Sequence, residues 1–332
     1  MGVINGIGNN VKDIYCDGKK IGTVYANGKV LYRSQTSQIV IDPAYNYYVF
    51  DVSKTDDNTI TLQENKAGDT TAWDGYTDWG DGTVSRGVSH TYKRKGIYIV
   101  KTKWMINSVY AGGGYDTSDY KSQEALVGCK NINANITIFA SLFYDCCYMR
   151  YADLSRLDVS NVESMKDMFY HCLSLKKLNL DGWDTSNVQD MSGMFDQCAQ
   201  LKPQVSHFNT SKVTNMRYMF YGCQLDGSHF KNWNVSKVTN TAYMFGSTDI
   251  TGRLDLSGWN VSKISTCSYM FSNCKANDGI DISNWNIDST IYFLNTIFDN
   301  LQCGDDTCSD IEHHVTHVGV SDDAWNIMAR KQ

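Results

Sequence analysis

The sequence has 332 residues and a formal net charge of −6, with 30 lysines and arginines against 36 aspartates and glutamates. It contains no basic run longer than KRK at residues 93–95, which argues against nucleic acid as a partner. It also contains no apolar stretch that approaches about 18 residues, so we expect no membrane insertion. A chain of this length is expected to form two or three domains.

Residues 1–36 predict a small antiparallel meander. The pairs Asp17-Gly18 and Asn27-Gly28 are typical hairpin turns, and strand-forming residues flank each of them. A meander of this size is too small to be stable alone, so we expect it to dock on a partner surface. The stretch VKDIYCDGKKI resembles short modules at the start of many phage tail and other virion proteins. This resemblance implies an anchoring module that binds other virion proteins.

Residues 37–107 predict a β-sandwich. Strand-forming stretches such as IVIDPAYNYYVFDV and IYIVKTKWMI surround the motif DWGDG and the later tripeptide HTY. These motifs closely resemble the signature of polycystic-kidney-disease-type (PKD) domains, which implies an immunoglobulin-like fold. Asp78, Asp81 and His90 could bind a metal such as calcium or transfer protons, but the ligand count is below that of an EF-hand loop. We favour a turn that the aspartate side chains hold by hydrogen bonds.

Residues 108–138 show no hydrophobic period and include the glycine run 112–114. Such a run can cradle phosphate, but the strand and helix that surround the glycines of a P-loop are missing here. We therefore expect a linker that leads into an N-terminal cap, since a solenoid must cover the apolar core of its first coil.

Residues 139–302 are dominated by a repeat. The segment GWDTSNVQDMSGMFDQC at residues 182–198 returns as HFNTSKVTNMRYMFYGC, NWNVSKVTNTAYMFGST and GWNVSKISTCSYMFSNC. The spacing between copies is 25 to 27 residues, within the range of leucine-rich repeats. About six to seven copies are expected. They share an anchor phenylalanine, at Phe143, Phe169, Phe195, Phe220, Phe245, Phe271 and Phe298.

Each copy predicts a strand, a turn and a short helix. Alternating apolar residues such as Leu178 and Leu180 predict a strand with one buried face. An Asp or Asn follows, which suits a turn. Two residues later a Ser suits a helix N-cap, and Ser186 and Gln189 have the spacing of a capping box. Apolar residues then recur on one helical face, so the sequence predicts an α/β solenoid.

Methionine and cysteine form regular columns around each anchor phenylalanine. These side chains are soft-metal ligands, and a copper(I) site is one interpretation. The columns fall where an interior face is required, and both residue types pack well there. Thr241 and Thr248 replace a Met and a Cys in one copy. We therefore expect a packed core with reduced thiols.

The pattern LDLSGWNVSK…MFSNC strongly resembles the BspA-type leucine-rich repeats of bacterial surface proteins and of phage virion proteins. The resemblance implies an α/β solenoid used for adhesion, with no enzymatic activity. The residues agree, because no Ser-His-Asp or Cys-His arrangement occurs in a recognisable context. We expect no catalytic residues and no cofactor. The fold class is thus multidomain α and β: a β-meander, a PKD-type immunoglobulin-like sandwich and a BspA-type solenoid.

The exposed side of the predicted strands is the candidate binding face. Its residues are mostly acidic or neutral, which favours a polar or cationic partner, such as a host cell-surface protein. No aromatic residue occurs among them, and carbohydrate sites usually have a stacking ring, so a glycan is the less favoured partner. A solvated face with no ligand is the alternative. The candidates are Asp153, Asn179, Asp181, Gln204, His229, Lys231, Asp255 and Asp281.

Residues 303–332 predict a C-terminal cap. The stretch CGDDTCSDIEHHVTH contains zinc-ligand residue types and an H-x3-H spacing, but its C-x4-C pair and short separation depart from a zinc finger. We therefore expect no metal, with zinc or a disulfide between the two cysteines as alternatives. The final SDDAWNIMARKQ predicts a short helix capped by Ser321. The weak zinc candidates are Cys303, Cys308, His313 and His317.

Three functions compete. The favoured one is a non-enzymatic phage virion protein, exposed on tail or capsid, which recognises the host surface through the repeats. We expect it to be oligomeric in its assembly, made in the host cytoplasm and released by lysis. The start MGVINGIGNNVKD lacks the regions of a secretory signal. A secreted BspA-type adhesin at the cell surface is therefore the alternative, and a glycan-active enzyme is less favoured still.

Overall fold

The computed structural model divides the chain into two compact units. One unit contains residues 1–136, 145–158 and 174–182, and the other contains residues 137–144, 159–173 and 183–332. Besides five short strands before residue 34, the structure describes residues 44–55, 57–64, 76–102, 106–107, 125–130, 139–291, 294–303, 306–307 and 311–329. Within these residues no helix is both long enough and apolar enough to cross a membrane.

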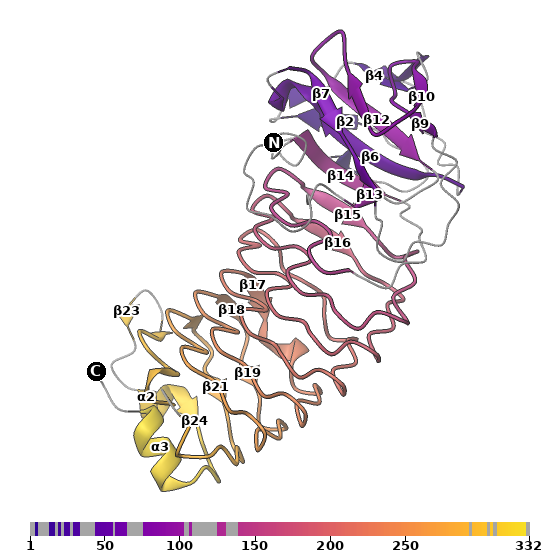
Figure 1. The fold of residues 1–332 in the computed structure, drawn as a ribbon. Helices are drawn as coiled ribbons and strands as arrows, with labels where there is room; N and C mark the ends of the chain where they lie inside the picture. Colours follow the sequence, from indigo (N-terminus) through magenta and orange to yellow (C-terminus); the bar gives the residue numbers. More distant parts are fainter. Residues whose placement is uncertain are drawn as a thin grey trace. The chain divides into compact units, whose positions relative to one another are not determined.

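The first unit is built on a mixed sheet of nine strands. Its central strands are rich in aromatic and β-branched residues, NYYVFD and IYIVKT, which favour extended backbone. The pairing is antiparallel except where β14 meets β15, β15 meets β16 and β4 meets β12. The main path follows β10 (Val84–Arg86), β9 (Tyr76–Asp78), β12 (Ile97–Thr102), β6 (Asn46–Asp51), β14 (Leu126–Lys130), β15 (Tyr151–Asp153) and β16 (Lys177–Asn179) (Figure 1).

Strand β14 joins two kinds of pairing in this sheet. It pairs antiparallel with β6 and parallel with β15, the first strand of the repeats. The segment predicted as linker and cap thus contributes a strand at residues 126–130, while residues 108–124 lie outside the described residues. Inside the first unit, the backbone ladder continues from the N-terminal strands into the first two repeat strands.

The predicted hairpins of the N-terminal meander are confirmed as strand pairs. Strands β2 (Asp13–Cys16) and β3 (Lys19–Lys20) pair antiparallel, as do β4 (Thr23–Ala26) and β5 (Lys29–Arg33). The turn residues between them lie outside the described residues. Strand β4 also pairs with β12, and β1 (Ile4–Asn5) pairs with β2. Two further ladders pair β7 (Thr59–Thr61) with β11 (Ser89–Thr91) and β8 (Gln63–Glu64) with β13 (Ile106–Asn107).

The DWGDG motif forms a turn held by its aspartates. Asp78 Oδ1 accepts a hydrogen bond from the Gly80 amide at 3.0 Å, and Asp81 Oδ1 accepts one from Thr83 at 3.0 Å. The second Asp81 oxygen lies 2.8 Å from Nε2 of His90, whose ring stacks on the buried Trp79. These bonds confirm the structural interpretation of the motif.

The second unit is a β-solenoid, and the solenoid as a whole has about six turns. Neighbouring coils are joined by backbone hydrogen bonds: Phe169 N–H donates to the Met194 carbonyl at 2.9 Å, and Phe195 N–H donates to the Met219 carbonyl at 2.9 Å. Five residues form a ladder of single parallel bridges between successive coils: Ser164, Asp190, Asn215, Asn240 and Thr266. Regular strands are short, as expected where each coil turns after a few residues.

Two longer parallel ladders lie in the later coils. One contains β17 (Gln224–Asp226), β18 (Asp249–Thr251), β20 (Lys275–Ala276) and β22 (Gln302–Cys303), and it ends with an antiparallel pair to β23 (Asp306–Thr307). The other contains β19 (Leu254–Asp255), β21 (Ile280–Asp281) and β24 (Val315–Thr316). The solenoid is therefore mostly β, and helix is scarce in the described residues.

The short helix predicted in each repeat is wrong. Residues two positions before and two after each of the first six anchor phenylalanines have positive φ, as at Gly193 (62°) and Gln197 (58°) around Phe195. A right-handed helix requires negative φ throughout, so it cannot pass these positions. The segment forms turns instead, and alternate N–H groups donate to carbonyl groups of the next coil. The predicted Ser N-caps are therefore not formed in these coils.

The predicted Asp and Asn turns are confirmed. Asp184 Oδ1 accepts a hydrogen bond from the Ser186 amide at 3.0 Å, and Asn209 does the same for Ser211 at 3.1 Å. The side chain thus closes the turn in place of a backbone carbonyl. The Ser serves as the amide donor of this turn.

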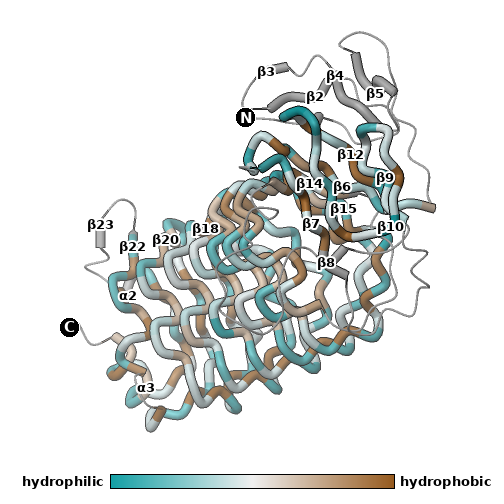
Figure 2. The backbone as a smooth tube through the Cα atoms, turned by 45° about the horizontal axis from the view of Figure 1, so that its top comes forward, coloured by the Kyte–Doolittle hydropathy of each residue, from teal (hydrophilic) through white to brown (hydrophobic). Residues whose placement is uncertain are grey.

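The core of the second unit consists of the predicted columns. Every anchor phenylalanine is buried, and neighbouring rings stack with centroids 5.3 to 6.0 Å apart. Hydrophobic and hydrophilic residues accordingly alternate along each coil (Figure 2). The methionine column is buried as well. These findings confirm the packing interpretation of the repeat.

The cysteine column adds hydrogen bonds to this packing. The thiols of Cys198 and Cys223 lie 3.0 and 2.9 Å from the carbonyl oxygens of Phe169 and Phe195 in the preceding coil. Thr248, in the same column, donates its hydroxyl hydrogen to the Phe245 carbonyl at 2.6 Å. Both thiols are free, and burial raises their pKa well above the ordinary value. The column is therefore a place for a small, weakly donating side chain.

The C-terminal end of the solenoid carries helices α2 (Ile311–His314) and α3 (Asp322–Met328). The side chain of Ser321 accepts the amide of Ala324, which confirms the predicted N-cap. Trp325 of α3 is buried and contacts the ring of Phe298, the last anchor phenylalanine. Helix α3 thereby covers the end of the phenylalanine column.

Replacement of an anchor phenylalanine should destabilise the solenoid strongly. Phe195→Ala removes a fully buried ring between two stacked neighbours, so we expect a loss of roughly 3–5 kcal/mol in the free energy of unfolding. Chemical denaturation of the full chain measures this loss. Leu173→Ala is the control because Leu173 is exposed. Equal stability of the two variants would contradict the stacking role of the column.

Candidate functional site

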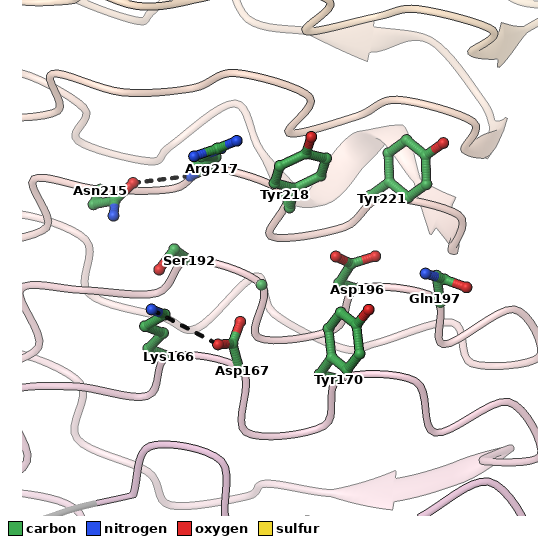
Figure 3. Close-up of a pocket in the computed structure, with 11 residues that line it drawn as sticks. Lys166, Asp167, Tyr170, Ser192, Asp196, Gln197, Asn215, Arg217, Tyr218 and Tyr221 are labelled. Carbon is green, nitrogen blue, oxygen red and sulfur yellow. Dashed lines mark hydrogen bonds and ion pairs between the residues drawn. The ribbon is translucent and has the colours of Figure 1, made fainter. Parts of the chain in front are cut away.

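A polar hollow lies on the surface of three successive coils of the second unit, with a volume of about 510 Å³. The first coil contributes Lys166, Asp167 and Tyr170, on both sides of the anchor Phe169. The second coil contributes Ser192, Gly193, Asp196 and Gln197, and the third contributes Asn215, Arg217, Tyr218 and Tyr221. Figure 3 shows these side chains, with tyrosines on two sides of Asp196.

The hollow lies at a coil that has no ring in either of two tyrosine columns. One column lies directly after the anchor phenylalanine (Tyr144, Tyr170 and Tyr221), and the other lies two positions before it and begins only in the next coil (Tyr218, Tyr243 and Tyr269). Tyr170 stacks on Tyr144 of the preceding coil at 4.6 Å, and Tyr218 stacks on Tyr243 of the following coil at 4.6 Å. In the coil between them, Asp196 occupies the position after the anchor where Tyr170 and Tyr221 stand. Gly193 likewise stands where Tyr218 and Tyr243 stand in later coils. Two ring positions are thus left open.

Gly193 is required by its surroundings. Its φ is 62°, and a Cβ atom built on it would clash with Oδ1 of Asp167. The Asp167 carboxylate therefore occupies the space above this glycine. Lys166 Nζ lies 3.9 Å from the other carboxylate oxygen of Asp167. Glycine at this point thus allows a carboxylate to line the hollow.

Two buried polar groups of the hollow lack hydrogen-bond partners within the described structure. Ser192 is 6% exposed and Asp196 is 7% exposed, and neither Ser192 Oγ nor Asp196 Oδ1 is hydrogen bonded. Burial and, to a smaller extent, the nearby charge of Asp167 raise the pKa of Asp196 to about 7. Unpartnered buried polar groups cost free energy, so a ligand that bonds to them would gain affinity.

The third coil brings a cation and two aromatic rings. The Arg217 guanidinium lies 4.9 Å from the ring centroid of Tyr218, within cation–π range. Asn215 Oδ1 accepts the Arg217 amide at 3.2 Å and so fixes the start of this segment. The rings of Tyr218 and Tyr221 meet edge to face at 5.6 Å. Contacts among these residues of the third coil thus fix this side of the hollow.

The strand face predicted as the binding surface is partly engaged in turns. Asp255 and Asp281 are register partners in β19 and β21, and each accepts a serine amide two residues later, Ser257 and Ser283. Lys231 Nζ lies 2.8 Å from Asp255. Although burial opposes it, hydrogen bonds from Lys231 and Ser257 lower the pKa of Asp255 to about 2.

The other residues of that face are distributed over different elements. Asp153 and Asn179 are register partners in β15 and β16, and each accepts the amide two residues later. His229 belongs to a 3-10 helix, Gly227–His229, and Gln204 lies outside the regular strands. Asp181, Gln204 and Lys231 are exposed, and the rest are partly buried. The face is a set of turn residues and coil-to-coil ion pairs rather than one continuous sheet.

The weak zinc candidates are only partly described. Cys308 lies outside the described residues, and the side chains of Cys303 and His313 are likewise not described. The His317 ring stacks on Trp325 with centroids 3.7 Å apart. His317 therefore packs on the C-terminal helix, and the zinc hypothesis stays a prediction.

The sequence contains a signal for the hollow that the strand-based reasoning missed. Three copies contain YMF, at Tyr218, Tyr243 and Tyr269, whereas the copy at residues 182–198 contains GMFD. These positions lie in the predicted helix of each copy, outside the strand positions of the candidate binding face. A comparison of the columns on both sides of the anchor phenylalanine would have revealed the missing rings.

The elevated pKa of Asp196 predicts a stability that falls as pH rises. The folded state keeps its proton up to about pH 7, whereas the unfolded chain loses it near 3.8. The free energy of unfolding should therefore decrease between about pH 4 and 7, by roughly 2–4 kcal/mol from this group. Asp196→Asn should remove this decrease and be more stable than wild type at pH 8.

Urea denaturation at pH 5 and pH 8 measures the effect. Asp184→Asn is the control, because Asp184 is an exposed turn residue and Asn stands at the same position in other coils. An Asp196→Asn variant with the pH slope of wild type would contradict the burial of an ionisable carboxyl group at this site.

Comparison with known proteins identifies the repeat region. Residues 137–251 and 203–310 match the model of a family described as "Mycoplasma protein of unknown function, DUF285". These two overlapping matches together span more than half of the chain. No curated protein and no solved structure is significantly similar to it. The chain therefore belongs to the DUF285 family, and the region that the family model matches is the β-solenoid.

Proposed function

We propose that this chain is a non-enzymatic recognition protein, exposed on the surface of a phage virion, whose solenoid binds a component of the host surface. One observation carries the proposal: the hollow between Tyr170 and Tyr221 offers aromatic rings and two buried polar groups that lack partners. The coil-to-coil hydrogen bonds hold these groups in place before any ligand arrives. Preorganisation of this kind lowers the entropy cost of binding.

The chemistry of the hollow favours binding over catalysis. Among the described residues that line the hollow, no histidine could activate Ser192. A glycan-active enzyme is therefore the less favoured function.

The assignment to a virion rests on resemblance. The N-terminal stretch resembles modules of virion proteins, and the DWGDG motif and the repeats resemble the PKD and BspA-type modules of surface proteins. Strands β1, β2 and β3 form a small sheet of their own among the described strands, which suits a module that docks on other virion proteins. A secreted BspA-type adhesin is the alternative.

Antibodies raised against the full chain can distinguish a virion protein from a secreted adhesin. Immunogold labelling of purified virions is the expected result. Labelling of the bacterial envelope but not of the virions would contradict the virion assignment and support the secreted adhesin. Absence of label from both surfaces would contradict surface recognition in either form.

Excess purified protein should slow virion adsorption to host cells if the solenoid contacts the host. The Tyr218→Ala variant should not slow adsorption, because it lacks a ring that lines the hollow and contacts the Arg217 guanidinium. Tyr269→Ala should compete like wild type. It is a matched control: both tyrosines have a φ of 57° and stack on Tyr243, but Tyr269 does not line the hollow.

A second variant tests the strand face in the same assay. A combination of Asp181→Asn, Asp255→Asn and Asp281→Asn removes three charges but keeps a side-chain oxygen for the turns at Asp255 and Asp281. If this variant loses competition while Tyr218→Ala retains it, the strand face is the contact surface and the hollow is not.

A further inference from the structure

We infer that the hollow is a carbohydrate subsite: one neutral sugar ring enters the gap between Tyr170 and Tyr221 and bonds to Ser192 and Asp196. This inference rests on the proposed function and names the class of ligand at the same site. It reverses the preference for a protein partner that the strand face suggested, because the aromatic residues lie in other columns of the repeat.

The gap has the place and the walls that a ring-shaped ligand needs. The tyrosine rings of neighbouring coils stack at 4.6 to 4.9 Å where the ladder is complete. At the coil of Phe195 the column directly after the anchor lacks its ring, because Asp196 stands there between Tyr170 and Tyr221 of the neighbouring coils. The apolar face of a pyranose ring packs on a tyrosine ring, whose hydroxyl end remains polar. A sugar ring would therefore occupy the position where the protein has no ring of its own.

The floor of the gap matches a ligand rich in hydroxyl groups. Each sugar hydroxyl can donate and accept at once, so different hydroxyls of one ring can bond to Ser192 Oγ and to Asp196 Oδ1. They can do so whether the Asp196 carboxyl group is protonated or ionised, since a hydroxyl changes its role. The amide side chain of Gln197 lines the same hollow and adds further donors and acceptors. A purely apolar ligand would leave the buried groups unsatisfied.

The charges of the hollow favour a neutral ligand. Lys166 and Arg217 supply two positive charges, and Asp167 and Asp196 supply two negative charges when both are ionised. An acidic ligand would approach the Asp167 carboxylate, and a cationic ligand would approach the two basic side chains. A neutral sugar avoids both unfavourable contacts. The charged groups can still form hydrogen bonds with its hydroxyls.

An array of neutral and acidic oligosaccharides, probed with the labelled full chain, tests the inference. We expect neutral glycans to be bound in preference to acidic ones. Calorimetric titration of the best glycan should then show affinity weaker by roughly tenfold in Tyr170→Ala, which removes one ring of the gap. Tyr269→Ala should bind like wild type, and thermal melting of both variants controls for folding.

The outcomes separate this inference from the function on which it rests. If no glycan binds, but Tyr218→Ala loses competition for adsorption, the recognition function stands and the ligand is not a saccharide. If a glycan binds equally to wild type and Tyr170→Ala, the sugar site lies elsewhere and the inference is wrong. Release of reducing sugar from a bound glycan would overturn the non-enzymatic function as well.

Discussion

The solenoid depends on backbone N–H groups that bind the next coil instead of their own. Residues of positive φ lie on both sides of the first six anchor phenylalanines and turn the chain so that alternate amides face the neighbouring coil. The same reversals point the Phe, Met and Cys side chains into the core. Some of these positions hold tyrosine, for which positive φ is unfavourable, so stacking between coils must offset a local backbone cost. Backbone and side-chain ladders therefore stabilise each other.

At the hollow the side-chain ladder between coils is incomplete. Asp196 and Ser192 are buried with polar atoms that bond to nothing in the described structure, and the raised pKa of Asp196 records the same cost in electrostatic terms. At the position of Asp196 both neighbouring coils have a tyrosine, Tyr170 and Tyr221. A destabilised position inside an otherwise regular framework is a common feature of functional sites, and it is the physical reason to seek a ligand here.

Much of the fold was predictable because a repeat reports the same environment several times. The buried Phe, Met and Cys columns, the Asp and Asn turns and the N-cap of Ser321 all followed from residue type and spacing. The helix did not, because apolar residues three and four apart fit a helix and also fit turns of alternating handedness. The distinction depends on which coil receives the amide of Met191, and spacing along one chain does not contain that information. The hollow was missed for a related reason, since its residues were assigned to that helix.

The gap at Asp196 lies in a column where both neighbouring coils have a tyrosine, Tyr170 and Tyr221. Each coil contacts only its neighbours, so the framework does not depend on which coil carries the gap. Exchange of a tyrosine for a small residue in another repeat would shift the opening along the column, and duplication of the repeat at residues 182–198 would lengthen it. Descendants of such a gene could thus acquire sites of different length and position through a few coding changes, while the scaffold that displays them stayed constant.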